Sequence, residues 1–286
     1  MTHELIFGTV GAPSSTPPKP GGSSGAIARI KELKLGALEL GWVQSVVATD
    51  KTCAAIKAAA EEQGIALSVH APYFINLNAD GKQWPASRER LIKAARAGFK
   101  AGATDIIFHP GTYFGQPPDQ VYRVARGRLA GVVAELRAEG NLATLRPETM
   151  GKSALFGTLE ETIQLSRDVE GVLPCIDFAH LHARRGDGSF NSYDEFTTAL
   201  RRVAAGLGQR GLRHVHLHMS GIEYGAKGER NHLMLKEADI KYRDLLRALI
   251  DIGAAGRVMV ESPDQEVDAL LLQKTYRRLL SKKRAA

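Results

Sequence analysis

Eight short apolar runs alternate along the chain with longer segments in which apolar and polar residues are mixed. The short runs have the length of β-strands and are mostly rich in Ile, Val and Leu; they cover residues 4–11, 37–43, 65–73, 105–113, 142–150, 173–183, 213–221 and 257–263. Between them, apolar residues recur at helical i, i+3, i+4 spacing, most clearly over 48–63, 87–102 and 192–208. The pattern predicts strands and helices that alternate throughout the chain.

Strand–helix alternation repeated eight times is typical of the (β/α)8, or TIM, barrel. We predict an α/β TIM barrel as a single domain over residues 1–286, with a long Pro/Gly/Ser-rich loop at 11–25 and a basic tail at 276–286. A doubly wound open sheet is the alternative. That fold usually carries a phosphate-binding glycine motif after its first strand, and no convincing one follows here.

The composition suits one large globular unit, with 44% hydrophobic and 24% charged residues in a chain of 286. No apolar run is long enough to span a membrane, and the N-terminal stretch lacks the pattern of a signal peptide. The two cysteines, Cys53 and Cys175, are too few for a disulfide framework. We therefore expect a cytoplasmic protein with no membrane partner.

The net charge of +7 and the pI near 9.4 favour polyanionic partners, because Lys and Arg neutralise phosphates. Part of the excess lies in the C-terminal tail, which a solvated helix end explains equally well. Charge alone therefore does not assign a nucleic-acid partner.

Ionisable residues recur where the predicted strands end, and in a barrel these ends meet on the face that carries active sites. They are His70, His109, Glu148, Asp177, His180, His216 and Glu261. Burying several carboxylates together is costly unless cations neutralise them, so the pattern indicates a metal site. Imidazole and carboxylate ligands without cysteine suit zinc, manganese or iron. Seven candidates exceed the four or so ligands of one zinc ion, which predicts more than one ion.

Two neighbouring motifs leave alternatives open. In "DFAHLHARRGDGS", Arg184 and Arg185 are suited to phosphate, although a solvated loop is an equal explanation. In "HVHLHMSG", the histidines at 214, 216 and 218 alternate and share one strand face. If that face points into the barrel, the depth of each histidine along the strand decides which one is a metal ligand, and the position nearest the strand end is favoured. His232 follows a glycine-broken loop and could fold back toward the site.

With these residues assembled, the chain resembles the endonuclease IV family of zinc-dependent apurinic/apyrimidinic (AP) endonucleases. The resemblance rests on "VHAPYFINL", "FHPGTY", "RPETMGK", "IDFAHLHARRGDG", "HLHMSG", "NHL" and "VESP", which follow one another in order. It implies a TIM barrel that cuts double-stranded DNA at abasic sites. The phosphodiester 5′ of the lesion would be hydrolysed, leaving a 3′-hydroxyl and a 5′-deoxyribose phosphate.

The resemblance also implies ligand sets for two or three Zn²⁺ ions, with Mn²⁺ as an alternative metal. The implied sets are His70, His109 and Glu148 for the first ion, Glu148, Asp177, His216 and Glu261 for the second, and His180 and His232 for the third. Glu148 and Glu261 are the implied catalytic residues. The family's Asp-x-His pattern for the third ion is broken, because Arg230 stands two residues before His232; Glu229 is the candidate substitute.

For the DNA itself we expect Tyr73 and Phe74 to enter the minor groove at the lesion, with Trp42 and Gln44 as further contacts. Packing of Phe74 beneath its loop is the alternative. We expect the enzyme to be a monomer.

Two other functions remain open at this stage. A metal-dependent sugar isomerase or epimerase of the xylose-isomerase-like barrels would need only Glu148, Asp177, His216 and Glu261, around one ion. A non-catalytic nucleic-acid-binding barrel would use the positive charge alone.

Overall fold

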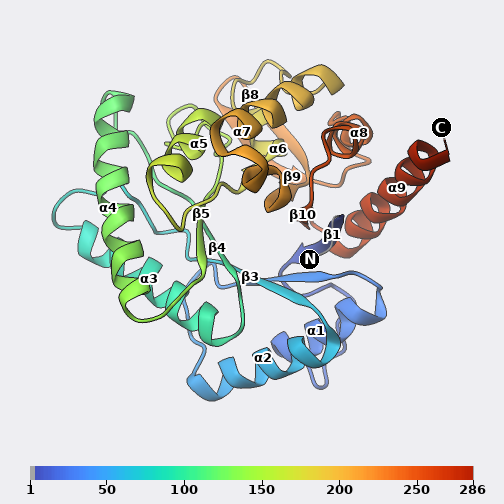
Figure 1. The fold of residues 1–286 in the computed structure, drawn as a ribbon, viewed down its shortest axis with the longest axis horizontal. Helices are drawn as coiled ribbons and strands as arrows, with labels where there is room; N and C mark the ends of the chain where they lie inside the picture. Colours follow the sequence, from blue (N-terminus) through green and yellow to red (C-terminus); the bar gives the residue numbers. More distant parts are fainter. Residues whose placement is uncertain (1–3, 286) are drawn as a thin grey trace.

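The computed structural model describes residues 4–285, which form the predicted single TIM barrel (Figure 1). Eight parallel strands make the barrel wall: β1 Leu5–Val10, β2 Ala37–Gly41, β3 Ala66–His70, β4 Asp105–Phe108, β5 Thr144–Pro147, β6 Ile176–Asp177, β7 Val215–Met219 and β10 Gly256–Val260. Each lies inside one of the predicted apolar runs, except that β10 begins one residue earlier, at Gly256. Parallel strands covered by helices are buried on both faces, which is why they read as continuous apolar segments.

The strands are hydrogen-bonded in the order β5-β4-β3-β2-β1-β10-β7-β6. The two ends of this sheet meet through backbone hydrogen bonds from Cys175 N to Pro147 O and from Thr149 N to Cys175 O, both 3.0 Å. These bonds close the barrel between β5 and β6, so the carboxyl ends of all eight strands share one face.

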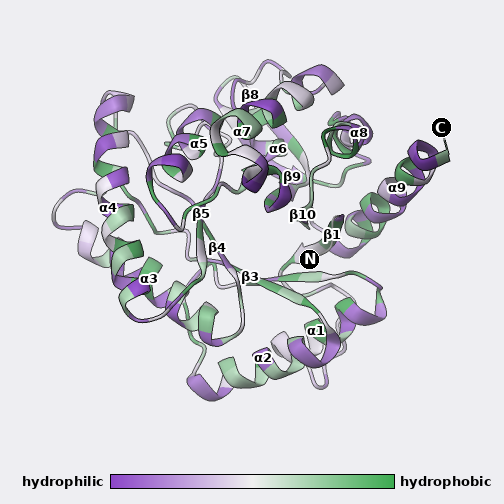
Figure 2. Ribbon diagram, in the orientation of Figure 1, coloured by the Kyte–Doolittle hydropathy of each residue, from purple (hydrophilic) through white to green (hydrophobic). Residues whose placement is uncertain are grey.

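In the described part of the chain, eight helices lie around the outside of the barrel: α1 Gly22–Glu32, α2 Asp50–Gln63, α3 Trp84–Lys100, α4 Pro118–Ala138, α5 Leu159–Asp168, α7 Tyr193–Arg213, α8 Tyr242–Ile252 and α9 Gln265–Ala285. The short helix α6 Phe178–Ala183 directly follows β6, and all of its residues are buried. In Figure 2, hydrophobic and hydrophilic residues alternate along α3 and α9, as expected for helices with one face on the sheet. No helix among residues 4–285 is both long and apolar enough to cross a bilayer.

Local signals fix where several helices begin and end. Thr49 caps α2, accepting a hydrogen bond from Thr52 N, and Gly64 ends the helix in a left-handed conformation. Thr158 and Glu161 form a reciprocal capping box at the start of α5.

The structure corrects four predicted boundaries. The loop predicted over 11–25 ends earlier, because α1 begins at Gly22. The predicted tail at 276–286 is the last part of helix α9 as far as Ala285. Helix α7 does not stop at Gly208 but continues through a kink there to Arg213. The glycine-broken loop after β7 is a hairpin of β8 Gly221–Gly225 and β9 Gly228–Leu233, which brings Glu229 and His232 back toward the barrel.

Candidate metal centre

The carboxyl ends of the strands bring the predicted ionisable residues together. His70 is the last residue of β3, Asp177 the last of β6, and Glu148 and Glu261 directly follow β5 and β10. Asp177 also caps α6, because its Oδ1 accepts a hydrogen bond of 2.7 Å from His180 N. A single local turn thus places Asp177 and His180 in the same site.

Glu148 lies at the middle of the centre and is fully buried. Its Oε2 is 3.3 Å from His70 Nε2 and 3.4 Å from His109 Nε2. Its Oε1 is 3.2 Å from both His180 Nδ1 and His218 Nδ1. Burial opposes ionisation, but the surrounding histidines, His218 first, hold the pKa of Glu148 well below its usual range. The carboxylate is therefore charged.

Two close groups of ligand atoms share Glu148. In each group the atoms all lie within 4.8 Å of one another; one is His70, His109 and Glu148, and the other is Glu148, Asp177, His218 and Glu261. A carboxylate common to two ligand groups can bridge two cations through its two oxygens. These residues offer nitrogen and oxygen donors, the set that zinc and manganese accept.

Unbonded carboxylate oxygens show that cations fit this centre. Glu148 Oε2, Asp177 Oδ2 and Glu229 Oε2 are buried, and none accepts a well-formed hydrogen bond. Leaving a buried acceptor unsatisfied costs about 1–3 kcal/mol, and more when the group is charged. Burial also raises the pKa of Asp177, although His180 Nδ1 lies 3.5 Å from its Oδ2 and opposes the shift. Bound cations would satisfy all three oxygens at once.

Backbone carbonyls fix the tautomers of two of the histidines. His70 Nδ1 lies 3.1 Å from Ala71 O and His180 Nδ1 lies 2.9 Å from Thr149 O. Because a carbonyl only accepts, each Nδ1 carries a hydrogen, and Nε2 is the nitrogen that could offer a lone pair to a cation. The Nε2 atoms of His70 and His180 each lie 3.3 Å from a carboxylate oxygen, of Glu148 and of Glu229 respectively.

From β7, His218 lies beside Glu148 and Glu261, whereas His216, the residue implied by the resemblance, does not. His218 Nδ1 is 3.4 Å from Glu261 Oε2 in addition to its contact with Glu148. His216 lies two residues deeper in the barrel, where its Nε2 is 2.8 Å from Glu39 Oε2. Burial lowers the pKa of His216 to about 4, so it is neutral at physiological pH. Of the two histidines, His218 is nearer the end of β7 and is therefore the candidate ligand that the structure supports from this strand.

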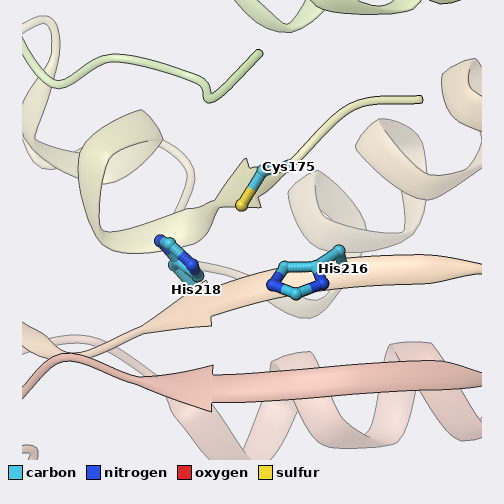
Figure 3. Close-up of side chains that lie close together, drawn as sticks. All are labelled: Cys175, His216 and His218. Atoms are coloured by element: carbon cyan, nitrogen blue, oxygen red, sulfur yellow. The ribbon is translucent and has the colours of Figure 1, made fainter. Parts of the chain in front are cut away.

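Figure 3 shows His216 and His218 on β7, with the sulfur of Cys175, the residue just before β6, pointing toward them. Their ligand atoms also lie within 4.8 Å of one another. Burial raises the pKa of the Cys175 thiol, and His216 is neutral. This group therefore lacks the negative charge of the two carboxylate groups and is a weaker candidate for a divalent cation.

Glu39 on β2 is a member of the buried cluster that the sequence patterns do not single out. It is fully buried and accepts hydrogen bonds from Ser68 Oγ at 2.8 Å, from His216 Nε2 at 2.8 Å and from His218 Nε2 at 3.0 Å. Burial opposes its ionisation, but the histidines, His218 first, hold the pKa of Glu39 well below its usual range. One signal was available, a lone acid inside the apolar run "ALELG".

The predicted third ligand set is only partly assembled. Glu229 Oε2 lies 3.3 Å from His180 Nε2, so Glu229 brings a carboxylate next to His180 where Arg230 cannot supply one. The rings of His180 and His232 are 5.5 Å apart, and Ser220 Oγ is 2.6 Å from His232 Nδ1. Among residues 4–285, these three residues do not form a group whose ligand atoms all lie within 4.8 Å.

A cavity of about 600 Å³ opens beside His109 at this face of the barrel. Its wall includes Tyr73, Phe74, Asn76, Lys82, Arg90, Thr112 and Met150. The side chain of Tyr73 packs against the centre, with its ring 5.6 Å from His70 and 5.3 Å from His109. The cavity therefore leads from two basic side chains to the first ligand group.

Exposed aromatic residues lie on two loops that contribute to the wall of this cavity. Tyr73 is 48% exposed and Phe74 60%, so Phe74 is not packed beneath its loop. Phe114, on the loop after β4, is 58% exposed and has a φ of 51°, a strained value for a bulky residue. The sequence patterns did not single out Phe114. Its loop is tied to the Tyr73 loop by a hydrogen bond of 3.0 Å from Asn78 Nδ2 to Thr112 O.

The other predicted DNA contacts differ in their surroundings. Arg184 is correctly placed beside the site, but its guanidinium donates to the carbonyls of Met150, Lys152 and Leu155, each at 2.8 Å. These bonds use three of the five N–H donors of the guanidinium, which indicates a structural role for Arg184. Arg185 and Gln44 are exposed, and Trp42 is half-buried against the core.

The chain belongs to the xylose isomerase-like TIM barrel family, whose model matches residues 27–281. It is 39% identical to "Uncharacterized protein MJ0133" of Methanocaldococcus jannaschii over 276 residues, which cover 96% of this chain and 98% of that one. It is 28% identical to "Probable endonuclease 4" of Staphylococcus carnosus over 182 residues, covering 60% of this chain and only 58% of that protein.

Solved structures from two classes of enzyme share the fold. A D-tagatose 3-epimerase-like protein has a TM-score of 0.74 at 17% identity, covering 98% of this chain and 99% of its own. Endonuclease IV from Thermus thermophilus has a TM-score of 0.70 at 19% identity, covering 97% of this chain and 99% of its own. At these identities the likeness shows the barrel and does not choose between the two activities.

Proposed function

We propose that this protein is a zinc-dependent AP endonuclease that acts on abasic sites in double-stranded DNA. It would hydrolyse the phosphodiester 5′ of the lesion and leave a 3′-hydroxyl and a 5′-deoxyribose phosphate, as a step of base excision repair. We further propose that it works as a cytoplasmic monomer. The observation that carries the proposal is the sharing of Glu148 between two ligand groups, because phosphodiester hydrolysis is often performed by paired ions.

Each ligand group has a defined part in this proposal. His70, His109 and Glu148 would hold one ion, and Glu148, Asp177, His218 and Glu261 the second. When bound, the ions supply the positive charge that stabilises a phosphate during hydrolysis. Glu261, whose side chain is 14% exposed, is the accessible carboxylate of the second group. It can hold the attacking water by accepting a hydrogen bond, while the buried Glu148 keeps the two groups together.

The rim of the cavity provides a means of finding an abasic site. Exposed aromatic side chains can enter the minor groove and unstack a base step, and a step with a missing base costs least to open. Tyr73, Phe74 and Phe114 are exposed aromatics on two joined loops beside the centre. Lys82 and Arg90 in the cavity wall are suited to the flanking phosphates.

A nicking assay tests the proposal. Chelator-stripped protein is reloaded with Zn²⁺ and given a duplex that contains one tetrahydrofuran abasic analogue, with the intact duplex as control. We expect a single break 5′ of the analogue, with a 3′ end that a polymerase extends. If zinc-loaded, folded protein leaves the abasic strand uncut, the proposed activity is wrong.

One observation favours a second candidate, a metal-dependent sugar isomerase or epimerase. The group Glu148, Asp177, His218 and Glu261 is by itself a complete ligand set for one divalent ion. One ion can polarise a ketose while two carboxylates move protons. This reaction gives no ligand role to His70 or His109, so the number of ions bound per chain separates the two candidates.

A further inference from the structure

Glu39 has the contacts of a group that acts through a metal ligand. Both of its oxygens are used: Oε1 accepts from His218 Nε2 at 3.0 Å, and Oε2 accepts from His216 Nε2 and Ser68 Oγ, each at 2.8 Å. It sits one strand away from Ser68 in register, on β2 and β3. The carboxylate is therefore held from three directions inside the barrel.

We propose that Glu39 is a positioning residue of the metal centre, which fixes the tautomer of His218 so that Nδ1 is its ligand atom. A carboxylate only accepts, so the Nε2 of His218 must carry a hydrogen when it bonds to Glu39. The other nitrogen, Nδ1, lies 3.2 Å from Glu148 Oε1 and 3.4 Å from Glu261 Oε2, and without a cation it also carries a hydrogen for these carboxylates. A cation would displace this hydrogen from Nδ1, because Glu39 holds the one on Nε2. A cation among these three atoms would be bound by Nδ1.

This arrangement is the reverse of the one at His70 and His180. There a backbone carbonyl holds Nδ1–H and leaves Nε2 toward the centre. His218 has no such carbonyl partner in its hydrogen bonds within residues 4–285, and the side chain of Glu39 takes that part from the opposite edge of the ring. A carboxylate behind a ligating histidine orients the ring and makes the ligand more basic.

A competing role for Glu39 follows from the same geometry. Its ligand atom also lies within 4.8 Å of those of His70 and His218, so it could bind an ion itself. In that case His218 would turn Nε2 toward the ion and lose its hydrogen bond to Glu39. The two roles therefore predict different protonated nitrogens on His218, and this difference can be measured in the wild-type protein.

The first test uses the full chain, labelled with ¹⁵N-histidine and loaded with Zn²⁺, in a long-range ¹H–¹⁵N correlation experiment. The His218 signals are identified by their loss in His218→Gln. We expect a protonated Nε2 and a zinc-bound Nδ1. A zinc-bound Nε2 would overturn the inference, whether or not any Glu39 variant folds.

The second test compares Glu39→Gln with Ser68→Ala by calorimetric titration of the stripped proteins with Zn²⁺. Loss of the carboxylate behind a ligating histidine typically weakens metal binding by about 10- to 100-fold, and we expect this for Glu39→Gln. Ser68→Ala removes one of the three contacts that hold Glu39 but spares the bond to His218, so it should weaken zinc binding much less than Glu39→Gln.

Wild-type affinity in folded Glu39→Gln would refute the inference. The inference rests on the metal centre of the proposed function and not on DNA as the substrate. A wild-type chain that binds no zinc would refute the centre and the inference together, whereas the results above refute the inference alone.

Discussion

Replacing Glu148 by Gln removes the charge that both ligand groups share. In the wild-type protein, a cation present at 100 times its Kd stabilises the folded state by about 2.7 kcal/mol. An unfolding entropy of about 2.1 cal/mol/K per residue gives about 0.6 kcal/mol/K for 286 residues. Each bound ion should therefore raise Tm by about 4–5 °C. Because Glu148 belongs to both groups, Glu148→Gln should lose this rise for both ions.

Differential scanning calorimetry of chelator-stripped protein, with Zn²⁺ added in steps, measures this rise. Glu237→Gln is the matched control, because Glu237 is exposed and outside the centre. Circular dichroism establishes that the stripped variants are folded. The reasoning is refuted if Glu148→Gln gains the same zinc-dependent increase in Tm as the wild type and the control.

Two further predictions separate structural residues from DNA contacts and from metal ligands. Arg184→Ala should lower the free energy of unfolding by about 1–3 kcal/mol, through its lost carbonyl bonds, without changing the salt dependence of DNA binding. Arg185→Ala should leave the free energy of unfolding unchanged and reduce the slope of log DNA affinity against log salt concentration by about 0.9. Denaturant melts and salt titrations of DNA binding measure both variants. A reduced slope for Arg184→Ala would contradict its assignment as a structural residue. Burial lowers the pKa of His216 in the folded protein to about 4, below its value of about 6.5 in the unfolded chain. As pH falls from about 6.5 to 4, the unfolded chain binds this proton and the folded protein does not, so the free energy of unfolding decreases. In metal-free protein, His216→Gln should lose this part of the pH dependence, and urea midpoints with the same pH slope as the wild type would contradict the prediction.

The barrel could be predicted from the sequence because its physical signal is local. A strand covered on both faces reads as an apolar run, and an ionisable residue at the end of such a run is conspicuous. His70, Glu148, Asp177 and Glu261 were found in this way, and the structure brings all four together.

Depth inside the barrel was harder to predict, because it depends on how neighbouring strands are staggered. His216 and His218 share one face of β7, yet only His218 reaches Glu148. Glu39 was missed for the same reason, since its three partners lie on β3 and β7, far away in the sequence. The role of Arg184 depends on carbonyls about thirty residues earlier in the chain, which no motif records.

The central claim is that paired ions share Glu148. Anomalous X-ray scattering at the zinc edge, from crystals of the zinc-loaded protein, tests it most directly. We predict at least two peaks at the carboxyl face of the barrel, with two of them about 3.5–4 Å apart and both bound to Glu148. A single peak, held by Glu148, Asp177, His218 and Glu261 alone, would contradict the account and favour the one-ion isomerase.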